Sequence, residues 1–342
     1  MRAFITGVAG LALTDEERAF VRETQPWGLI VFRRNIASPD ALLRLTEDFR
    51  ATLSRDAPVL IDQEGGRVQR MAPPLWPQYP PAAAYGALYD RDRATGLAAA
   101  RLGARLIAAD LAAVGIDVDC MPLADVRVAG ADAVIGDRAF GTQPDKVAAL
   151  AGAFAEGLAD GGVLPVVKHI PGHGRATADS HQRLPVVAAE RAALEATDFA
   201  AFRPLAGMPL AMTAHVVFSA IDPVAPATTS AAIVGDVIRG FIGFQGLLMS
   251  DDISMGALSG SLGERTRAAI SAGCDVVLHC NGVMDEMLAV AAAAPQLQGD
   301  AARRAAAALA GKRPAAAIDL DPKRAEFLAL MRENWEPARG SA

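Results

Sequence analysis

Short apolar runs recur along the chain, and stretches with helical spacing of apolar residues separate them. The runs are rich in Val, Ile and Leu, and they are Phe4–Val8, Gly28–Phe32, Val59–Ile61, Ile116–Met121, Leu164–Val167, Leu210–Thr213, Gly246–Met249 and Asp275–Leu278. Apolar residues three and four apart predict helices between most of these runs, most clearly at Pro39–Leu53, Arg93–Val114, Lys146–Leu158 and Leu262–Ala272. Strands that are apolar throughout are typical of parallel sheets covered by helices on both faces. The pattern therefore predicts eight successive strands joined by helices.

Eight such units indicate an α/β protein with a single (β/α)8 TIM-type barrel over residues 1–342, with terminal helices from about residue 292. The competing interpretation is an open parallel sheet. Three signatures of open α/β sheets are missing from the sequence: a Gly-x-Gly-x-x-Gly after an early strand, a Walker phosphate loop and a Gly-x-Ser-x-Gly elbow. No linker or change of composition divides the chain, so we expect one domain.

Met1-Arg2 is followed by a mostly apolar stretch from Ala3 to Leu13, which resembles a short signal peptide. Thr14 follows at once with Glu17 three residues later, a capping box that predicts the start of a helix, and no small-residue cleavage region is present. A buried first strand is therefore the better interpretation. The sequence has three cysteines, an odd number, and no Cys-x-x-Cys pair. This favours core residues of a protein in a reducing compartment over a disulfide framework. No stretch is apolar enough to span a bilayer. We expect a cytoplasmic protein.

Composition and charge exclude several kinds of partner. The sequence is 52% hydrophobic and 21% charged, with a net charge of −6 and a pI of about 5.5. An acidic surface does not suit nucleic acid or anionic membranes. We therefore expect no nucleic-acid or membrane partner. Separately, we expect a monomer that acts on a small molecule.

Polar side chains gather where the predicted strands end. They lie in Asp62-Gln63-Glu64-Gly65-Gly66-Arg67-Val68-Gln69-Arg70, in Asp125 with Gly136-Asp137-Arg138-Ala139-Phe140-Gly141, in Lys168-His169-Ile170-Pro171-Gly172-His173-Gly174 with Asp179-Ser180-His181, in Thr213-Ala214-His215, and in Ser250-Asp251-Asp252. Ionisable groups next to apolar strands are costly unless they are paired or used. In a barrel the carboxyl ends of the strands meet at one mouth, where active sites lie. The sequence thus predicts one polar mouth.

Each of these residues also has a purely structural interpretation. Asp252 is in position to cap a helix, and Arg67 or Arg70 to pair with Glu64 on the surface. His173 and His215 are equally compatible with scaffold histidines, and packing is the better interpretation for His279. Taken together, the structural interpretations are less favoured, because several strands would have to place ionisable groups at one mouth of the barrel by chance.

The segment Lys168–His181 carries the most chemistry, with three histidines, a lysine and an aspartate among Pro and Gly residues. Two interpretations remain open on spacing alone. His169, His173 and His181 with Asp179 have the donor atoms of a zinc site. Alternatively, Asp179 orients His181, which carries a proton to and from a substrate.

These motifs resemble glycoside hydrolase family 3, in particular its bacterial β-N-acetylhexosaminidase branch. The resemblance rests on Lys168–Gly174 followed by Asp179–His181, and it is supported by Ile61–Arg70, Ile135–Gly141 and Ser250–Met255. The motifs occur in the same order, each at the end of a strand. The resemblance covers roughly residues 1–290.

The resemblance implies a role for each matching residue. Asp251 is the expected nucleophile and His181 the general acid/base, with Asp179 as its partner on a mobile loop, Gly174–Arg183. The residues expected to bind the terminal aminosugar are Asp62, Arg70, Arg138, Lys168 and His169. No metal and no cofactor are expected.

A substrate and a pathway also follow from the resemblance. Cytoplasmic members of this branch remove terminal N-acetylglucosamine (GlcNAc) from GlcNAc–1,6-anhydroMurNAc, with or without peptide, during peptidoglycan recycling. We therefore expect a retaining β-N-acetylglucosaminidase acting on such muropeptides. The alternatives are a family 3 enzyme for another sugar, such as a β-glucosidase, a metal-dependent barrel hydrolase, and a catalytically silent sugar-binding barrel. The roles of His173, His215 and Asp252 stay open.

Overall fold

Eight parallel strands close into a barrel within residues 1–337, the part of the chain that the computed structural model describes. Around the barrel, the strands are β1 (Arg2–Thr6), β12 (Val276–His279), β11 (Leu247–Asp252), β9 (Leu210–Thr213), β7 (Leu164–Ile170), β6 (Val118–Asp119), β3 (Val59–Ile61) and β2 (Pro26–Val31). The barrel closes where β1 pairs with β12, with Phe4 opposite Val277. The predicted (β/α)8 barrel is confirmed, and the open sheet is wrong. Residues 338–342 of the expected domain lie outside the described part.

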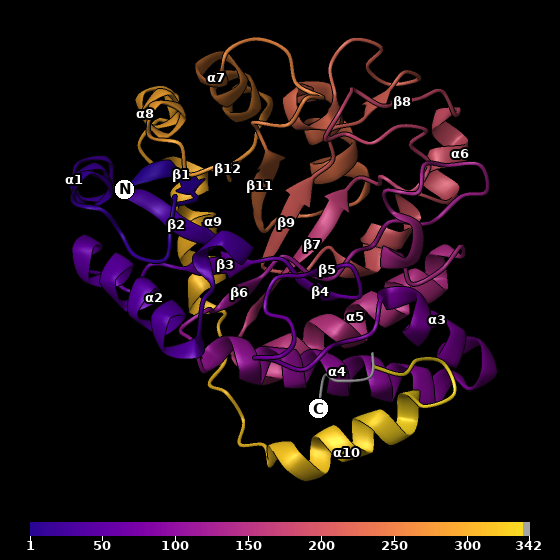
Figure 1. The fold of residues 1–342 in the computed structure, drawn as a ribbon. Helices are drawn as coiled ribbons and strands as arrows, with labels where there is room; N and C mark the ends of the chain where they lie inside the picture. The colour runs from indigo at the N-terminus through magenta and orange to yellow at the C-terminus, as the bar shows by residue number, and fades with distance from the viewer. Residues whose placement is uncertain (338–342) are drawn as a thin grey trace.

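Helices follow the strands and lie outside them (Figure 1). They are α1 (Asp15–Thr24), α2 (Pro39–Leu53), α3 (Ala82–Arg91), α4 (Arg93–Ala112), α5 (Pro144–Asp160), α6 (Arg191–Ala196), α7 (Leu262–Ala272), α8 (Met284–Ala293), α9 (Gly299–Ala310) and α10 (Leu320–Met331), with a π-helix at Ile233–Phe241 between β9 and β11. Single 3-10 turns occur at Arg33–Asn35, Gly136–Arg138 and Ala227–Thr229, and a longer one at Ala200–Leu205. The predicted bounds of α2 and α7 are confirmed at both ends.

The capping box at the start of α1 is present. Thr14 accepts a hydrogen bond from the Glu17 backbone N–H at 3.1 Å, and the Glu17 carboxylate accepts one from the Thr14 backbone N–H at 2.8 Å. The same carboxylate also binds the Ala9 N–H at 2.8 Å. A local sequence signal thus fixes where α1 begins.

Alternate strand residues face two different cores. Leu29 and Val31 pack between the barrel and the helices, whereas Ile30 between them points into the barrel. In β3, Leu60 likewise belongs to the interior and Ile61 to the outer core. Burial on both faces explains why the strands are apolar throughout, so that polar side chains at their carboxyl ends stand out.

The tail helices cover the barrel away from its polar mouth. Ala305 and Ala308 of α9 pack with the residues of the barrel interior. Helix α10 lies along the outer side of α4 (Figure 1), and its Phe327 also meets the ring of Tyr85 in α3 with 6.2 Å between centroids. Among the described helices, none is both long and apolar enough to cross a membrane.

Candidate active site

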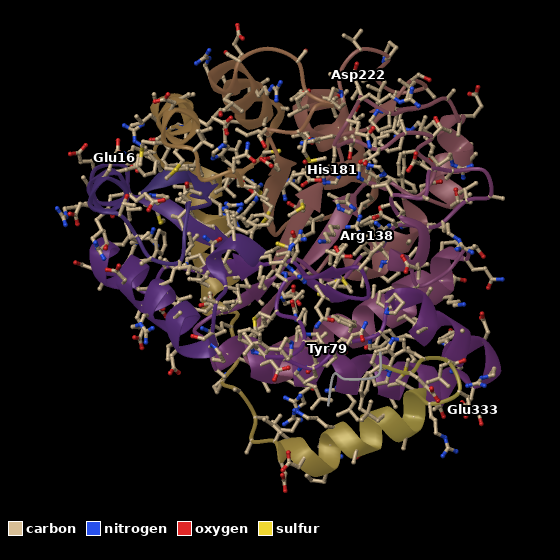
Figure 2. All side chains as sticks on the ribbon, in the orientation of Figure 1. Glu16, Tyr79, Arg138, His181, Asp222 and Glu333 are labelled. Carbon is tan, nitrogen blue, oxygen red and sulfur yellow. The ribbon has the colours of Figure 1, made fainter. Side chains whose placement is uncertain are left out.

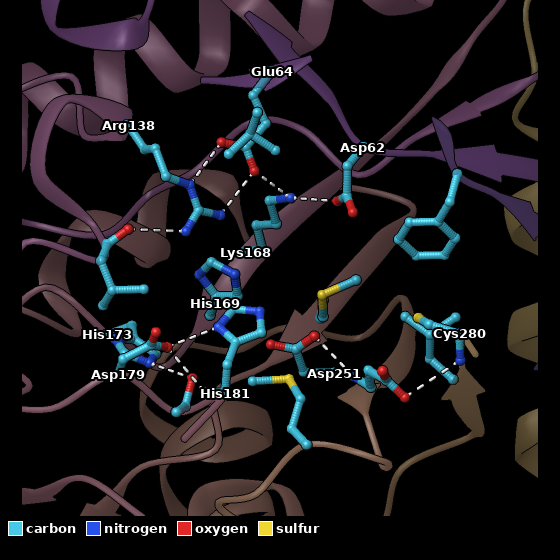
Figure 3. A pocket seen from close by; sticks show the side chains of 18 of the residues that line it. Asp62, Glu64, Arg138, Lys168, His169, His173, Asp179, His181, Asp251 and Cys280 are labelled. Atoms are coloured by element: carbon cyan, nitrogen blue, oxygen red, sulfur yellow. Dashed lines mark hydrogen bonds and ion pairs between the residues drawn. The ribbon is translucent and has the colours of Figure 1, made fainter. Parts of the chain in front are cut away.

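A cavity of about 470 Å³ opens at the carboxyl ends of the barrel strands (Figure 3). Its wall contains all the side chains that the sequence predicted to act, which are Asp62, Arg70, Arg138, Lys168, His169, Asp179, His181 and Asp251. Figure 2 shows Arg138 and His181 over the middle of the molecule, whereas Glu16 and Glu333 lie at its edge. The barrel therefore brings together residues that are up to 189 positions apart, from Asp62 to Asp251.

One side of the cavity is a row of alternating charges (Figure 3). Arg70 Nη2 lies 3.1 Å from Asp62 Oδ2, and Asp62 Oδ1 lies 2.8 Å from Lys168 Nζ. The same ammonium is 2.7 Å from Glu64 Oε1. Arg138 then closes the row with two hydrogen bonds of 2.8 Å to the Glu64 carboxylate. Three cations and two carboxylates leave this row with an excess of positive charge.

Burial and pairing set the protonation of this row. Burial by itself would raise the pKa of the Asp62 and Glu64 carboxyls, but the neighbouring cations outweigh it. The pKa of Glu64 falls to about 2, because Arg138 and Lys168 favour its charged form, and that of Asp62 falls further below its ordinary value, because of Lys168 and Arg70. Burial would lower the pKa of Lys168, yet Asp62 and Glu64 raise it above its ordinary value. All three groups are therefore charged near neutral pH.

Glu64 is the residue that the sequence interpretation missed. The sequence predicts it only as a surface partner of Arg67 or Arg70, and both of those pairings are wrong. Glu64 is 3% exposed and binds Arg138 and Lys168, while Arg67 pairs with Asp137 at 3.1 Å and Arg70 with Asp62. The sequence does contain a signal for its position. In an extended segment, side chains two residues apart point to the same side, so Glu64 is expected on the same side as Asp62.

The turn that carries Glu64 is a small hairpin. β4 (Gln63–Gly65) pairs antiparallel with β5 (Val68–Gln69), and the Gln63 side-chain oxygen accepts the backbone N–H groups of Arg70 and Met71 at 3.0 Å each. Gly65 has a φ of 88°, which favours glycine. The hairpin folds the chain back, so that Arg70 returns to Asp62.

The buried carboxylate of Asp125 holds the start of the His-rich segment by hydrogen bonds. This fully buried carboxylate accepts the His169 Nδ1–H at 2.7 Å and the His173 backbone N–H at 2.6 Å. Burial would raise the pKa of Asp125, but these donors hold it below its ordinary value. With Nδ1 bound to Asp125, Nε2 is the ring nitrogen of His169 left for the cavity.

Asp179 and His181 form a pair at the cavity rim. Asp179 Oδ1 accepts from the His181 backbone N–H at 2.9 Å and lies 2.7 Å from His181 Nδ1. Burial would raise the pKa of Asp179, but these bonds lower it. The His181 side chain is 63% exposed. The pair can therefore hold Nδ1 and present Nε2 for proton transfer, whereas Asp179 acts through the ring.

The loop of this pair is bonded to the loop that follows β11. The Gly256 N–H donates to the His181 carbonyl at 3.2 Å, and the Ala257 N–H to the Ser180 carbonyl at 3.1 Å. On the inner side, the Ser180 hydroxyl lies 3.0 Å from His173 Nε2. Burial lowers the pKa of His173 to about 4, so this ring is neutral near pH 7. His173 thus acts as a scaffold histidine under the loop.

Asp251 is the second-to-last residue of β11, and its carboxylate faces the cavity (Figure 3). Its Oδ1 accepts the Asp252 backbone N–H at 2.8 Å. Burial would raise the pKa of Asp251, but His169, His215 and this N–H hold it below its ordinary value. Asp251 is therefore an ionised carboxylate near neutral pH, suited to attack an electrophilic carbon.

Asp252 caps a turn and not a helix, which corrects one of the structural alternatives. Its carboxylate accepts from Ser254 N–H at 3.0 Å and from the Ser254 hydroxyl at 2.6 Å, and α7 begins only at Leu262. His279 packs inside the barrel wall with Nε2 at 2.9 Å from Glu286, as the packing interpretation predicted.

The three histidines of the zinc interpretation each have their own partner. His169 Nδ1 binds Asp125, His173 Nε2 binds Ser180, and His181 Nδ1 binds Asp179. Over residues 1–337, no group of three or more His, Cys, Asp or Glu side chains is arranged to hold a metal ion. The cavity brings together the Asp251 carboxylate, a histidine with a carboxylate partner and a cationic wall.

Known proteins resemble this chain over most of its length. It matches the profile described as the glycosyl hydrolase family 3 N terminal domain over residues 5–308. A β-hexosaminidase from Alkalilimnicola ehrlichii is 42% identical over 279 residues, covering 80% of this chain and 79% of that protein. A β-hexosaminidase from Aromatoleum aromaticum is 41% identical over 278 residues, covering 80% and 78%.

The fold is also similar to solved structures. NagZ from Neisseria gonorrhoeae, in complex with N-trifluoroacetyl-D-glucosamine, aligns with a TM-score of 0.84 and 33% sequence identity, over 97% of this chain and 96% of that one. Native NagZ from the same organism aligns with a TM-score of 0.85, covering 98% of each chain. The similarity thus includes the whole barrel and its mouth.

Proposed function

Because the chain belongs to glycosyl hydrolase family 3 and is a β-N-acetylhexosaminidase, we propose that it removes terminal β-linked GlcNAc by a two-step retaining mechanism. The observation that carries the mechanism is the arrangement of Asp251 and the Asp179–His181 pair. The ionised carboxylate and the histidine line the same cavity, and backbone hydrogen bonds join their loops. A nucleophile and a proton carrier on one substrate site are what a retaining glycosidase requires.

In the first step, an oxygen of Asp251 attacks the anomeric carbon, and the bond to the leaving oxygen breaks. His181 Nε2 gives its proton to that oxygen, while Asp179 stabilises the ring and its Nδ1–H. In the second step, His181 takes a proton from water, and the resulting hydroxide attacks the anomeric carbon and releases Asp251. Histidine thereby takes the place of the second carboxyl group that most retaining glycosidases use.

The cationic wall is the proposed site of the sugar. Lys168 and Arg138 offer charged donors for hydroxyl groups or for the N-acetyl carbonyl, and Asp62 offers an acceptor for hydroxyl groups. Arg70 and the Nε2 of His169 complete the polar lining. In this mechanism the N-acetyl group contributes to specificity and is not the nucleophile, because Asp251 has that role.

The proposed substrates are GlcNAc–1,6-anhydroMurNAc and its peptide-bearing forms, hydrolysed in the cytoplasm during peptidoglycan recycling. The motif resemblance to the cytoplasmic branch of the family supports this proposal. The curated relatives are named β-hexosaminidases, and a similar solved structure holds an N-acylated glucosamine analogue. These names favour an aminosugar over glucose, and therefore the hexosaminidase over the β-glucosidase alternative.

An activated fluorinated N-acetylglucosaminide tests the mechanism. Such a compound forms the glycosyl-enzyme quickly and releases it slowly, so the labelled peptide can be identified by mass spectrometry. We expect the label on Asp251, and none in an Asp251→Asn variant. Label on another residue, or turnover without label, would reject the assignment of Asp251.

A further inference from the structure

His215 lies directly behind the strand end that carries Asp251. It follows β9, is 0% exposed and is not part of the cavity wall. Its Nε2 is 3.0 Å from the carbonyl oxygen of Asp252. A carbonyl oxygen only accepts hydrogen bonds, so Nε2 carries a hydrogen. His215 therefore donates to the residue that follows the proposed nucleophile.

Two threonines hold the other side of this ring. His215 Nδ1 lies 2.7 Å from Thr228 Oγ1, which lies 2.8 Å from Thr213 Oγ1. Burial lowers the pKa of His215, and a ring that is neutral with hydrogen on Nε2 accepts at Nδ1. Thr228 then donates to Nδ1, its closer acceptor, since the Ala214 carbonyl is 3.1 Å away. Thr213 in turn donates to Thr228.

Asp252 connects this ring to the nucleophile. Its carbonyl is bound by His215, and its carboxylate by Ser254 and by the Cys280 N–H at 3.3 Å. These contacts fix the residue from several sides. Its remaining polar group, the backbone N–H, donates to Asp251 Oδ1 at 2.8 Å. One carboxylate oxygen of Asp251 is thus held, and the other is left for attack.

We propose that His215 is a positioning residue for the nucleophile, which holds the Asp252 backbone so that its N–H fixes the carboxylate of Asp251 in the attacking orientation. This inference rests on the proposed role of Asp251. His215 does not line the cavity, so its loss changes the step in which the bond to Asp251 forms and leaves the affinity for sugar unchanged. Loss of a residue that merely supports the fold would not slow this step while leaving the affinity for sugar unchanged.

The matched variants are His215→Gln and His215→Met. Glutamine keeps an N–H donor at about the distance of Nε2, whereas methionine has similar volume without a donor. His279→Met is the control, because His279 is equally buried on β12, the strand on the other side of β11, and bonds to Glu286. Four measurements are made on each protein: the rate of labelling by the fluorinated glycoside, kcat/KM for a nitrophenyl N-acetylglucosaminide, the Kd of GlcNAc and the Tm.

We expect His215→Met to lower the labelling rate and kcat/KM by about 100-fold, the usual effect of a small misplacement of a reacting group. GlcNAc should bind within about twofold of wild type, because no contact with the sugar is lost. His215→Gln should recover part of the loss, and His279→Met should react like wild type. The acid limb of kcat/KM should move to higher pH in His215→Met, because the Asp252 N–H that lowers the pKa of Asp251 is then no longer fixed. His169 and His181 face Asp251 in both proteins.

Thr228→Val and Thr228→Ser provide a second pair, should the His215 variants fail to fold. Valine removes the hydroxyl that binds Nδ1 and should slow labelling, whereas serine keeps it and should not. Labelling of folded His215→Met or Thr228→Val at the wild-type rate would overturn the proposal, as would an equal loss of GlcNAc affinity. Failure of the proposed function is distinguishable, because then wild type itself would carry no label on Asp251.

Discussion

The Lys168 ammonium lies 2.7 Å from the Glu64 carboxylate and 2.8 Å from that of Asp62, so two acidic groups hold one buried cation. Lys168 is 2% exposed, and Arg138 binds both oxygens of the Glu64 carboxylate. A buried ammonium with two carboxylate partners has little freedom to move. Glu64 thereby sets the positions of both Lys168 and Arg138, the two cations proposed to bind the sugar.

Replacing Glu64 by glutamine should weaken sugar binding. Lys168 would keep only Asp62 as an anionic partner, and Arg138 would lose its paired contact. We expect the Kd of GlcNAc to rise at least about tenfold and the free energy of unfolding to fall by about 3 kcal/mol, as when one partner of a buried ion pair is removed. Calorimetric titration and urea unfolding measure the two effects. Asp137→Asn is the control, because Asp137 pairs with Arg67 at the half-exposed rim. A wild-type Kd in Glu64→Gln would contradict this role.

Removing the proposed proton carrier should affect poor leaving groups most. A nitrophenolate departs without a proton, whereas a sugar alkoxide does not. In His181→Ala we expect kcat/KM for a nitrophenyl glycoside to fall by about 10-fold or less and that for the natural disaccharide by about 1,000-fold or more. Steady-state rates on the two substrates measure the difference. Equal losses on both would argue against His181 as the acid.

A methyl group at Gly256 should separate the two catalytic loops. A Cβ there would stand 2.9 Å from the Gln182 carbonyl oxygen and 3.0 Å from that of His181. Because these are backbone atoms, the loop of His181 would have to shift. We expect Gly256→Ala to lower kcat by about 10- to 100-fold, with little change in the Tm.

Gly207→Ala is the matched control for this variant. No atom lies within 4 Å of a Cβ added at Gly207, which is in a turn before β9. Hydrogen exchange of the segment 179–183 should rise in Gly256→Ala and stay unchanged in the control. Unaltered exchange and kcat in Gly256→Ala would show that the bonds between these loops do not position His181.

His173 should make the protein less stable in weak acid. Its pKa is about 4 in the folded chain, against an ordinary value of 6.5. As the pH falls below 6.5, the unfolded chain takes up the proton first, so stability is complete above that pH and falls toward pH 4. The loss should approach about 3 kcal/mol.

Urea unfolding at several pH values measures this loss. His173→Gln keeps an N–H group for Ser180 but does not titrate. The difference in unfolding free energy between wild type and variant should therefore shrink as the pH falls from 6.5 to 4. His215 and the carboxylates also titrate, but they do so in both proteins and cancel in the difference. A difference that is constant with pH would contradict the prediction for His173.

The sequence by itself determined the barrel strands and the mouth at which the chemistry lies. Strands buried on both faces are continuous apolar runs, which can be identified without knowing which strand each one pairs with. The capping box of Thr14 and Glu17 is an equally local signal. The family resemblance of the motifs at strand ends implied the eight site residues, and the structure places them around one cavity.

Only the tertiary structure decided how these residues are held. Glu64 meets Arg138 from 74 positions away, and His215 reaches Asp252 across 37. The His-rich segment offered donors for a metal as well as for a proton pathway, and only the tertiary structure shows that each ring has a separate hydrogen-bond partner. Periodicity along a strand tells which face a side chain occupies. Which atom it meets depends on the register between strands and on the path of the loops, and a local pattern contains neither.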